Sequence, residues 1–162
     1  MTKSLRKTRN DLPAKARAAM VDLLNDNLAD AIDLRLHTKT AHWNVKGPNF
    51  IALHELFDTL AEELEEYIDT TAERAVSLGG TAHGTVRMAA KASRLPELNI
   101  TDQEGEAFVE ALCDRYAALA KSTRNAIDDA DNADDVDTSD LFTAFSRWLD
   151  KSLWFLEAHL VR

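Results

Sequence analysis

The sequence has few of the residues that break helices and only one that can cross-link chains. Its 162 residues include only five glycines, three prolines and one cysteine. A single cysteine excludes an intrachain disulfide, so nothing in the sequence indicates an oxidising compartment. The longest stretch without a formal charge covers residues 75–86, too short for a membrane span. No apolar segment follows the basic N-terminus, so we expect no secretory signal, no membrane association and a cytoplasmic location.

Hydrophobic periodicity predicts helices rather than strands. Apolar side chains recur every four residues over 20–36, which indicates an amphipathic helix. An Asp-x-Pro sequence at Pro13 is typical of its start, and Gly47, followed by proline, is expected to end it. A second, unusually acidic helix is expected over residues 49–78, where Gly79 and the next glycine would end it.

Two more long helices are expected after a connection that contains a short helix over residues 86–93. Thr101 and Glu104 have the spacing of a capping box, which predicts the start of the third long helix. Thr138 or Ser139 is expected to cap the fourth. Strand-like alternation and internal repeats are absent from the sequence. The prediction is therefore an all-α fold, a four-helix bundle with a short extra helix in its middle crossover.

Charge is distributed unevenly along the chain. The net charge is −9, yet residues 1–17 hold six basic residues and one acid, which gives +5. The remaining residues hold 13 basic residues and 27 acids, which gives −14. We therefore expect a flexible basic tail over residues 1–10, attached to an acidic helical domain over residues 11–162.

The candidate chemistry lies in histidines and carboxylates. His54 with Asp58, and Asp69 with Glu73, are two i, i+4 pairs within about 100° of one helix face. The pairs are centred about 22 Å apart along the helix, too far to bind one ion in one chain. A two-fold axis through the middle of the helix would bring each pair opposite the other in a second copy, and His42 can add a second imidazole. A solvated acidic face with a packed histidine is the alternative.

Three segments then resemble the Dps family, the bacterial miniferritins. Two of them carry the family motifs HWN-x₂-G-x₂-F-x₃-H-x₃-D and D-x₃-E with the family's spacing, and the third is similar to the family's last helix. The resemblance covers essentially the whole chain from about residue 10. The segments are AHWNVKGPNFIALHELFD (41–58), YIDTTAERAVSLGG (67–80) and SRWLDKSLWFLEAHL (146–160).

This resemblance implies a ferritin-like bundle in a hollow dodecameric shell with two-fold and three-fold interfaces. Its ferroxidase sites would lie at the two-fold interfaces, with His42, His54 and Asp58 from one subunit and Asp69 and Glu73 from its neighbour. The implied reaction is oxidation of Fe(II), preferably by hydrogen peroxide, with ferric mineral stored inside. Zn(II) and Co(II) are plausible competitors for such ligands.

Other residues have both a functional and an ordinary interpretation. Trp43, next to His42, would either intercept stray radicals or simply pack. A run of seven aspartates over residues 128–140 is either a solvated turn or, as the resemblance implies, part of a three-fold pore through which iron enters. The pore candidates are Asp131, Asp135 and Asp140.

The basic tail gives a second candidate function. Lys3, Arg6, Lys7 and Arg9 can neutralise DNA phosphates without base specificity, and many tails on one shell would bind multivalently. A solubilising tail is the alternative. Three functions therefore stay open: an iron-oxidising store, a nucleoid-associated protein that compacts DNA, and a helical interaction module without metal.

Overall fold

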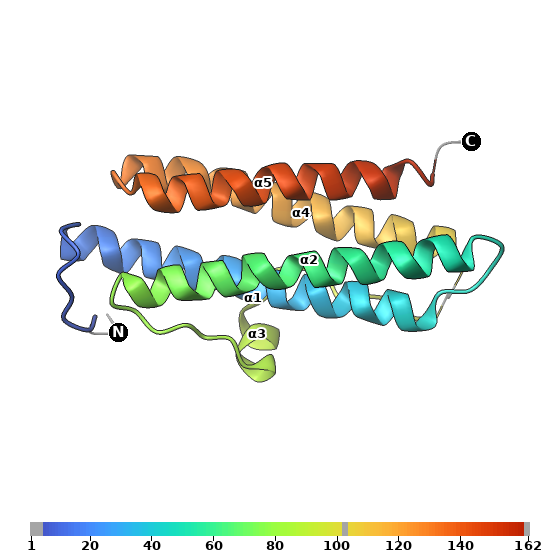
Figure 1. The fold of residues 1–162 in the computed structure, drawn as a ribbon. Helices are drawn as coiled ribbons and strands as arrows, with labels where there is room; N and C mark the ends of the chain where they lie inside the picture. The colour runs from blue at the N-terminus through green and yellow to red at the C-terminus, as the bar shows by residue number, and fades with distance from the viewer. Residues whose placement is uncertain (1–4, 102–103, 161–162) are drawn as a thin grey trace.

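The computed structural model describes residues 5–101 and 104–160, and these form five helices (Figure 1). The described residues contain no strand; their only β-type pairing is an isolated bridge between Lys46 and Glu104. No helix among them is long and apolar enough to cross a membrane. The all-α prediction is therefore confirmed. The helices are α1 (Ala14–Asn44), α2 (Phe50–Ser77), α3 (Val86–Ala92), α4 (Gly105–Asn132) and α5 (Val136–Glu157).

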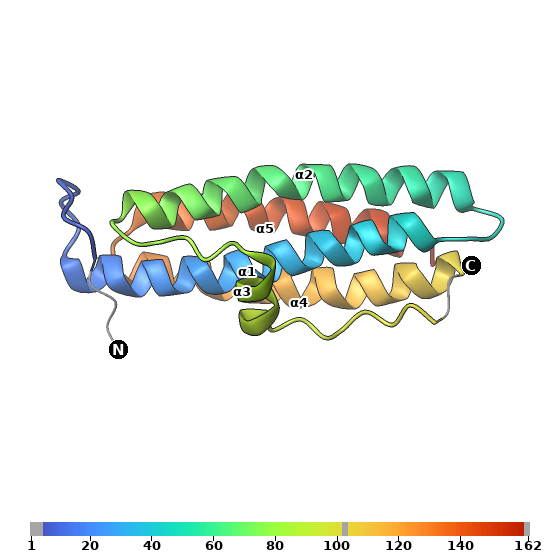
Figure 2. The same ribbon diagram turned by 90° about the horizontal axis from the view of Figure 1, so that it is seen from below.

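The four long helices form two antiparallel hairpins that pack into one bundle. α1 packs mainly against α2, and α4 packs mainly against α5. The crossover from α2 to α4 runs along the outside of α1, where α3 projects from the bundle (Figure 1), and its second part also contacts α4 (Figure 2). This is the predicted bundle with a short helix in its middle crossover.

Two glycines end the first hairpin's helices in backbone conformations that other residues rarely adopt. Gly47 has φ of +111° in the turn between α1 and α2, and Gly79 has φ of +92° after α2. A Cβ at Gly79 would lie 2.7 Å from the backbone oxygen of Arg6, so a side chain there would also clash. The predicted ends of both helices are thus correct to within a few residues.

The predicted starts of the last two long helices are wrong. Glu104 rather than Thr101 is the N-cap of α4, and the Glu104 side chain makes no capping hydrogen bond. Its position is set by a tertiary contact, because the Gly105 amide donates to the carbonyl of Lys46 at 3.1 Å. Asp135 caps α5, where it accepts a hydrogen bond from the Thr138 amide.

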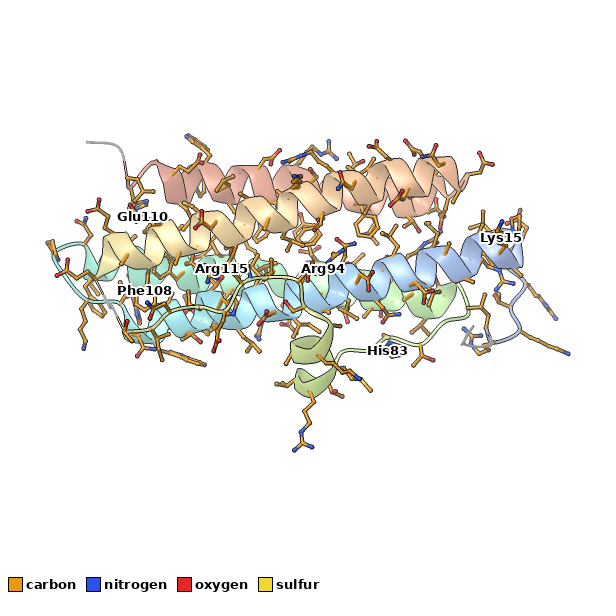
Figure 3. All side chains as sticks on the ribbon, turned by 180° about the vertical axis from the view of Figure 1, so that it is seen from behind. Lys15, His83, Arg94, Phe108, Glu110 and Arg115 are labelled. Carbon is orange, nitrogen blue, oxygen red and sulfur yellow. The ribbon has the colours of Figure 1, made fainter. Side chains whose placement is uncertain are left out.

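A buried carboxylate and a buried arginine hold the crossover against the bundle. Asp30, fully buried on α1, accepts hydrogen bonds from the Arg94 guanidinium at 2.7 and 2.9 Å. Arg115 of α4 donates to the crossover carbonyl of Pro96 at 3.1 Å. Figure 3 shows Arg94 and Arg115 on the side of the bundle along which the crossover runs. These contacts fix a segment that has little regular structure of its own.

Part of the basic N-terminal segment lies against the bundle. The Arg6 amide donates to Gly79 O at 2.7 Å, and its guanidinium donates to Val76 O at 2.9 Å. Leu5 and Leu12 pack against the apolar cluster at this end of the bundle. Within the segment that the sequence predicts to be a flexible tail, Leu5 and Arg6 therefore contact the bundle, Arg6 at the C-terminal end of α2. Lys3 lies outside the described residues.

We predict that Asp135→Ala lowers the free energy of unfolding by about 2–4 kcal/mol. The substitution removes the α5 cap and leaves the Arg74 guanidinium, 2.6 Å from the buried Asp135 carboxylate, without its main partner. Chemical denaturation checks this, with Asp137→Ala as the matched control. Asp137 lies 3.5 Å from Arg74 but is 84% exposed, so its loss should change stability little. Equal effects of the two substitutions would contradict this role of Asp135.

Candidate metal centre

Two histidines meet where α1 ends and α2 begins. His42 lies in the last turn of α1 and is almost fully buried, and His54 lies near the start of α2. Because the two helices are antiparallel, residues 12 apart in the chain become neighbours. The two imidazole rings stack, with centroids 3.7 Å apart and an interplanar angle of 22°.

Reciprocal hydrogen bonds determine which ring nitrogen of each histidine is free. His42 Nδ1 lies 2.7 Å from the carbonyl oxygen of His54, and His54 Nδ1 lies 2.9 Å from that of His42. A carbonyl oxygen only accepts, so each Nδ1 must carry the proton. In the neutral imidazoles both Nε2 atoms therefore have free lone pairs, and their rings are held in place as ligating histidines usually are.

Asp58 adds a carboxylate to the histidine pair. It lies one helical turn after His54, and its Oδ1 is 4.0 Å from His42 Nε2. The same oxygen is ion-paired with the Lys39 ammonium group. The hydrogen bond from Lys39 holds the pKa of the Asp58 carboxyl below its usual value; burial opposes this, and His42 and His54 add to it. An ionised carboxylate and two imidazole nitrogens thus gather at one place.

Asp69 and Glu73 do not join this group within one chain. Both are exposed on α2, further toward its C-terminal end. Within residues 5–101 and 104–160, no cluster of three or more metal-binding side chains has metal-site geometry. His42, His54 and Asp58 thus lie near one another without forming a metal site by themselves, and the exposed Asp69 and Glu73 are accessible to another molecule.

One of the two aromatic residues nearest the histidine pair in the sequence contacts it. The Phe50 ring lies 5.1 Å from the His54 ring, centroid to centroid. Trp43 is 66% exposed, so within one chain it does not have the ordinary packing role that the sequence left open.

His37, which is close to His42 in the sequence, does not join the histidine pair. It lies 3.3 Å from Asp33 beside the crossover, where burial lowers the pKa of His37.

The pore candidates around the acidic turn between α4 and α5 include both exposed and buried carboxylates. Asp131 and Asp140 are exposed, as a pore-lining role requires. Asp135 does not fit the pore-lining role expected for it, because its carboxylate is buried and bonded to Arg74 and Thr138 within the same chain. The sequence could not separate these aspartates, since a helix cap and a solvated acid have the same side chain.

The candidate DNA-binding residues of the N-terminal segment also differ in whether their side chains are bonded to the bundle. Lys7 and Arg9 are exposed, whereas Arg6 is bonded to the end of α2. At the histidine pair, the residue that the sequence did not single out is Lys39. It lies one turn before His42, but its contact with Asp58 depends on the register between α1 and α2, which no local sequence signal provides.

Comparisons with known proteins agree with this geometry. Residues 21–162 match the family model described as a ferritin-like domain. The chain is 50% identical over 154 residues to the DNA protection during starvation protein of Agrobacterium fabrum, covering 95% of each chain. The structure of Mycobacterium smegmatis Dps in its tetragonal form aligns with a TM-score of 0.90 and 33% identity, covering 100% of this chain and 96% of that one.

A more distant structure adds a chemical class. The Dps protein of Vibrio cholerae O1 aligns with a TM-score of 0.90 and 25% identity, covering 98% of this chain and 99% of that one. It is described as a member of a broad superfamily of ferritin-like diiron-carboxylate proteins. That protein's class agrees with the imidazole and carboxylate groups gathered here.

We predict that Lys39→Met tightens Co(II) binding to the assembled protein by about threefold to tenfold. Lys39 now neutralises Asp58 and would repel a cation bound to the same carboxylate. Titration with Co(II), followed by its visible absorption, measures the affinity. Lys151→Met is the control, since this ammonium group lies over the Phe155 ring on α5. Unchanged affinity in the Lys39 variant would show that this ion pair does not compete with metal.

Proposed function

The chain belongs to the Dps family of ferritin-like proteins, and we propose that it oxidises Fe(II) at sites shared between two copies of itself. The observation that carries this proposal is the incomplete ligand group at the start of α2. Two imidazoles with free Nε2 atoms and one ionised carboxylate are oriented together, and a second chain can supply the missing oxygen ligands.

The symmetry of α2 supports the position of the second chain. A two-fold axis that crosses the helix between Glu63 and Leu64 relates His54 to Glu73 and Asp58 to Asp69. All four side chains lie within about 100° of the helix circumference.

The exposed apolar residues of α2 obey the same symmetry. The same axis relates Ile51 to Val76, and these side chains are 60% and 42% exposed. Both lie near the middle of the stripe that carries the metal-ligand candidates. An antiparallel pair of α2 helices would therefore bury an apolar contact beside each metal site, which favours this interface.

The ligand set determines the chemistry that the site can support. Two imidazole nitrogens and three carboxylates suit Fe(II), with Zn(II) and Co(II) as competitors. Two Fe(II) ions can each give one electron to hydrogen peroxide, which breaks the O–O bond and yields two hydroxide ions. Supplying both electrons together avoids release of hydroxyl radical. His42 and His54 would hold the iron, and the carboxylates would offset its charge.

Storage and uptake complete the proposed function. We infer a dodecameric shell with two-fold and three-fold interfaces, in which the oxidised iron is stored as mineral in the cytoplasm. Asp131 and Asp140 remain the candidates for a cation-attracting pore, and Trp43 for a radical trap beside the site. Removing Fe(II) and peroxide together would protect DNA, which agrees with the name of the Agrobacterium relative.

Mixing two inactive variants tests the shared site. His54→Ala/Asp58→Ala removes one half of every site, and Asp69→Ala/Glu73→Ala removes the other half. Each variant alone should lose rapid peroxide-dependent oxidation of Fe(II). In oligomers co-assembled from equal amounts, half of the dimers are mixed and each has one intact site, so about a quarter of the wild-type rate should return. Stopped-flow absorbance measures the rate.

The result distinguishes sites within a chain from sites between chains. If all ligands came from one chain, both variants would remain inactive in every mixture. Size-exclusion chromatography of each variant provides the control that the oligomer still assembles. Full activity in either variant alone would refute the ligand assignment.

Non-specific DNA binding is the second candidate function. The exposed Lys7 and Arg9 favour it, because their charges remain available although Arg6 is bonded to the bundle. Many weak tail contacts on one shell would add up, whereas the acidic body would repel DNA. This function would act on the nucleoid and would not need iron oxidation.

We predict that Lys7→Ala/Arg9→Ala weakens DNA binding in a gel shift at low salt, and that deletion of residues 1–10 abolishes it. The tail charges would neutralise phosphates, so binding should also fall steeply with added salt. Lys121→Ala/Lys151→Ala changes the net charge equally on exposed parts of α4 and α5 and should have a smaller effect. Retention of DNA by the truncated protein would exclude the tail as the binding element.

A further inference from the structure

Three buried polar residues interrupt the apolar core of the bundle. Asn27 on α1, Thr71 on α2 and Thr123 on α4 are each at most 1% exposed. The side-chain oxygens Asn27 Oδ1, Thr71 Oγ1 and Thr123 Oγ1 have no hydrogen-bond partner among the described residues. Leaving a buried polar atom unpaired costs about 1–3 kcal/mol, so three in one core require an explanation.

The helix register places the three residues at the same level of the bundle. Between α1 and α2, Arg17 contacts Leu78 and Lys39 contacts Asp58, so Asn27 faces the turn that contains Thr71. The separation along the axis is within about one helical turn.

The register between α1 and α4 likewise places Asn27 and Thr123 at the same level of the bundle. These helices are antiparallel, and Thr38 contacts Tyr116 at 3.2 Å. Further along, Leu24 lies in one apolar cluster with Ala126. This register brings Asn27 to the level of Thr123. The polar layer therefore lies between the two apolar clusters of the bundle.

The hydroxyl groups of the threonines in this layer differ in their hydrogen bonding from those of other helical threonines. Thr38, Thr59 and Thr70 each donate a hydrogen bond to the carbonyl one turn earlier. Thr71 and Thr123 do not, although they are buried. The Asn27 amide nitrogen donates to Leu23 O at 3.0 Å, which leaves only its oxygen unpaired. The free hydrogen-bonding groups thus face the core.

We propose that Asn27, Thr71 and Thr123 bind one buried water molecule inside each subunit. The water would donate hydrogen bonds to Asn27 Oδ1 and to one threonine hydroxyl and accept one from the other. Three partners are typical for a buried water. A metal ion does not fit, because all three oxygens are neutral and a cation in this apolar setting would lack a compensating charge.

The water would also stabilise the part of α2 that bears metal-ligand candidates. Thr71 lies between Asp69 and Glu73 in the chain and on the opposite side of the helix, at about 180° from them. The water site itself does not depend on the proposed function, because it involves neither metal nor a second subunit.

A crystal structure of the assembled wild-type protein that resolves ordered waters tests the proposal. We expect one density peak at about 2.7–3.0 Å from the three oxygens. The peak should disappear or weaken in Thr71→Val. In addition, Thr71→Val should lower the apparent Tm by about 2–4 °C at a fixed scan rate, because the water loses a partner. The neighbouring Thr70→Val is the control, since this residue is exposed and its hydroxyl bonds to its own helix.

Two results would overturn the proposal. A wild-type structure with no density between the three oxygens excludes the water. A raised Tm in Thr71→Val also excludes it, because replacing an unpaired buried hydroxyl with a methyl group stabilises the fold. The sign of the Tm shift therefore separates a hydrated site from a dry one.

Discussion

The antiparallel register between α1 and α2 is the constraint on which the candidate site depends. It brings His42 beside His54, so that each imidazole donates its Nδ1 proton to the backbone carbonyl of the other residue. These two hydrogen bonds fix the position, orientation and tautomer of both rings. The same register places Lys39 against Asp58. A shift of one residue between the helices would separate these groups by altering both the level and the face of each side chain.

Carboxylates serve distinct purposes according to their burial. Asp30 and Asp135 are buried and paired with arginines, and they hold the crossover and the start of α5. The carboxylates on the outer face of α2 are exposed and have the spacing to meet a second copy of the chain. The acidity of the body is therefore partly structural and partly available to cations. Its net charge alone describes neither role.

Much of the fold could be predicted from the sequence, because helix periodicity and glycine ends are local signals. The five helices and the crossover were expected, and the ends of α1 and α2 were close. The starts of α4 and α5 were predicted wrongly. Thr101 has the capping pattern, but the bond from Gly105 to Lys46 sets the start of α4 from another part of the chain. Asp135, expected in a pore, is the α5 cap because its carboxylate meets Arg74 from α2.

The sequence by itself determined that the chain is helical, that one histidine and three carboxylates share one helix face, and that the two pairs within that set are too far apart for one ion. These properties follow from residue identity and a fixed rise per residue. Tertiary structure decided which groups are free to act. It freed the Nε2 atoms of His42 and His54, engaged Asp135 and attached Arg6 to the bundle. Those outcomes depend on contacts between segments distant in the chain, which local sequence patterns do not encode.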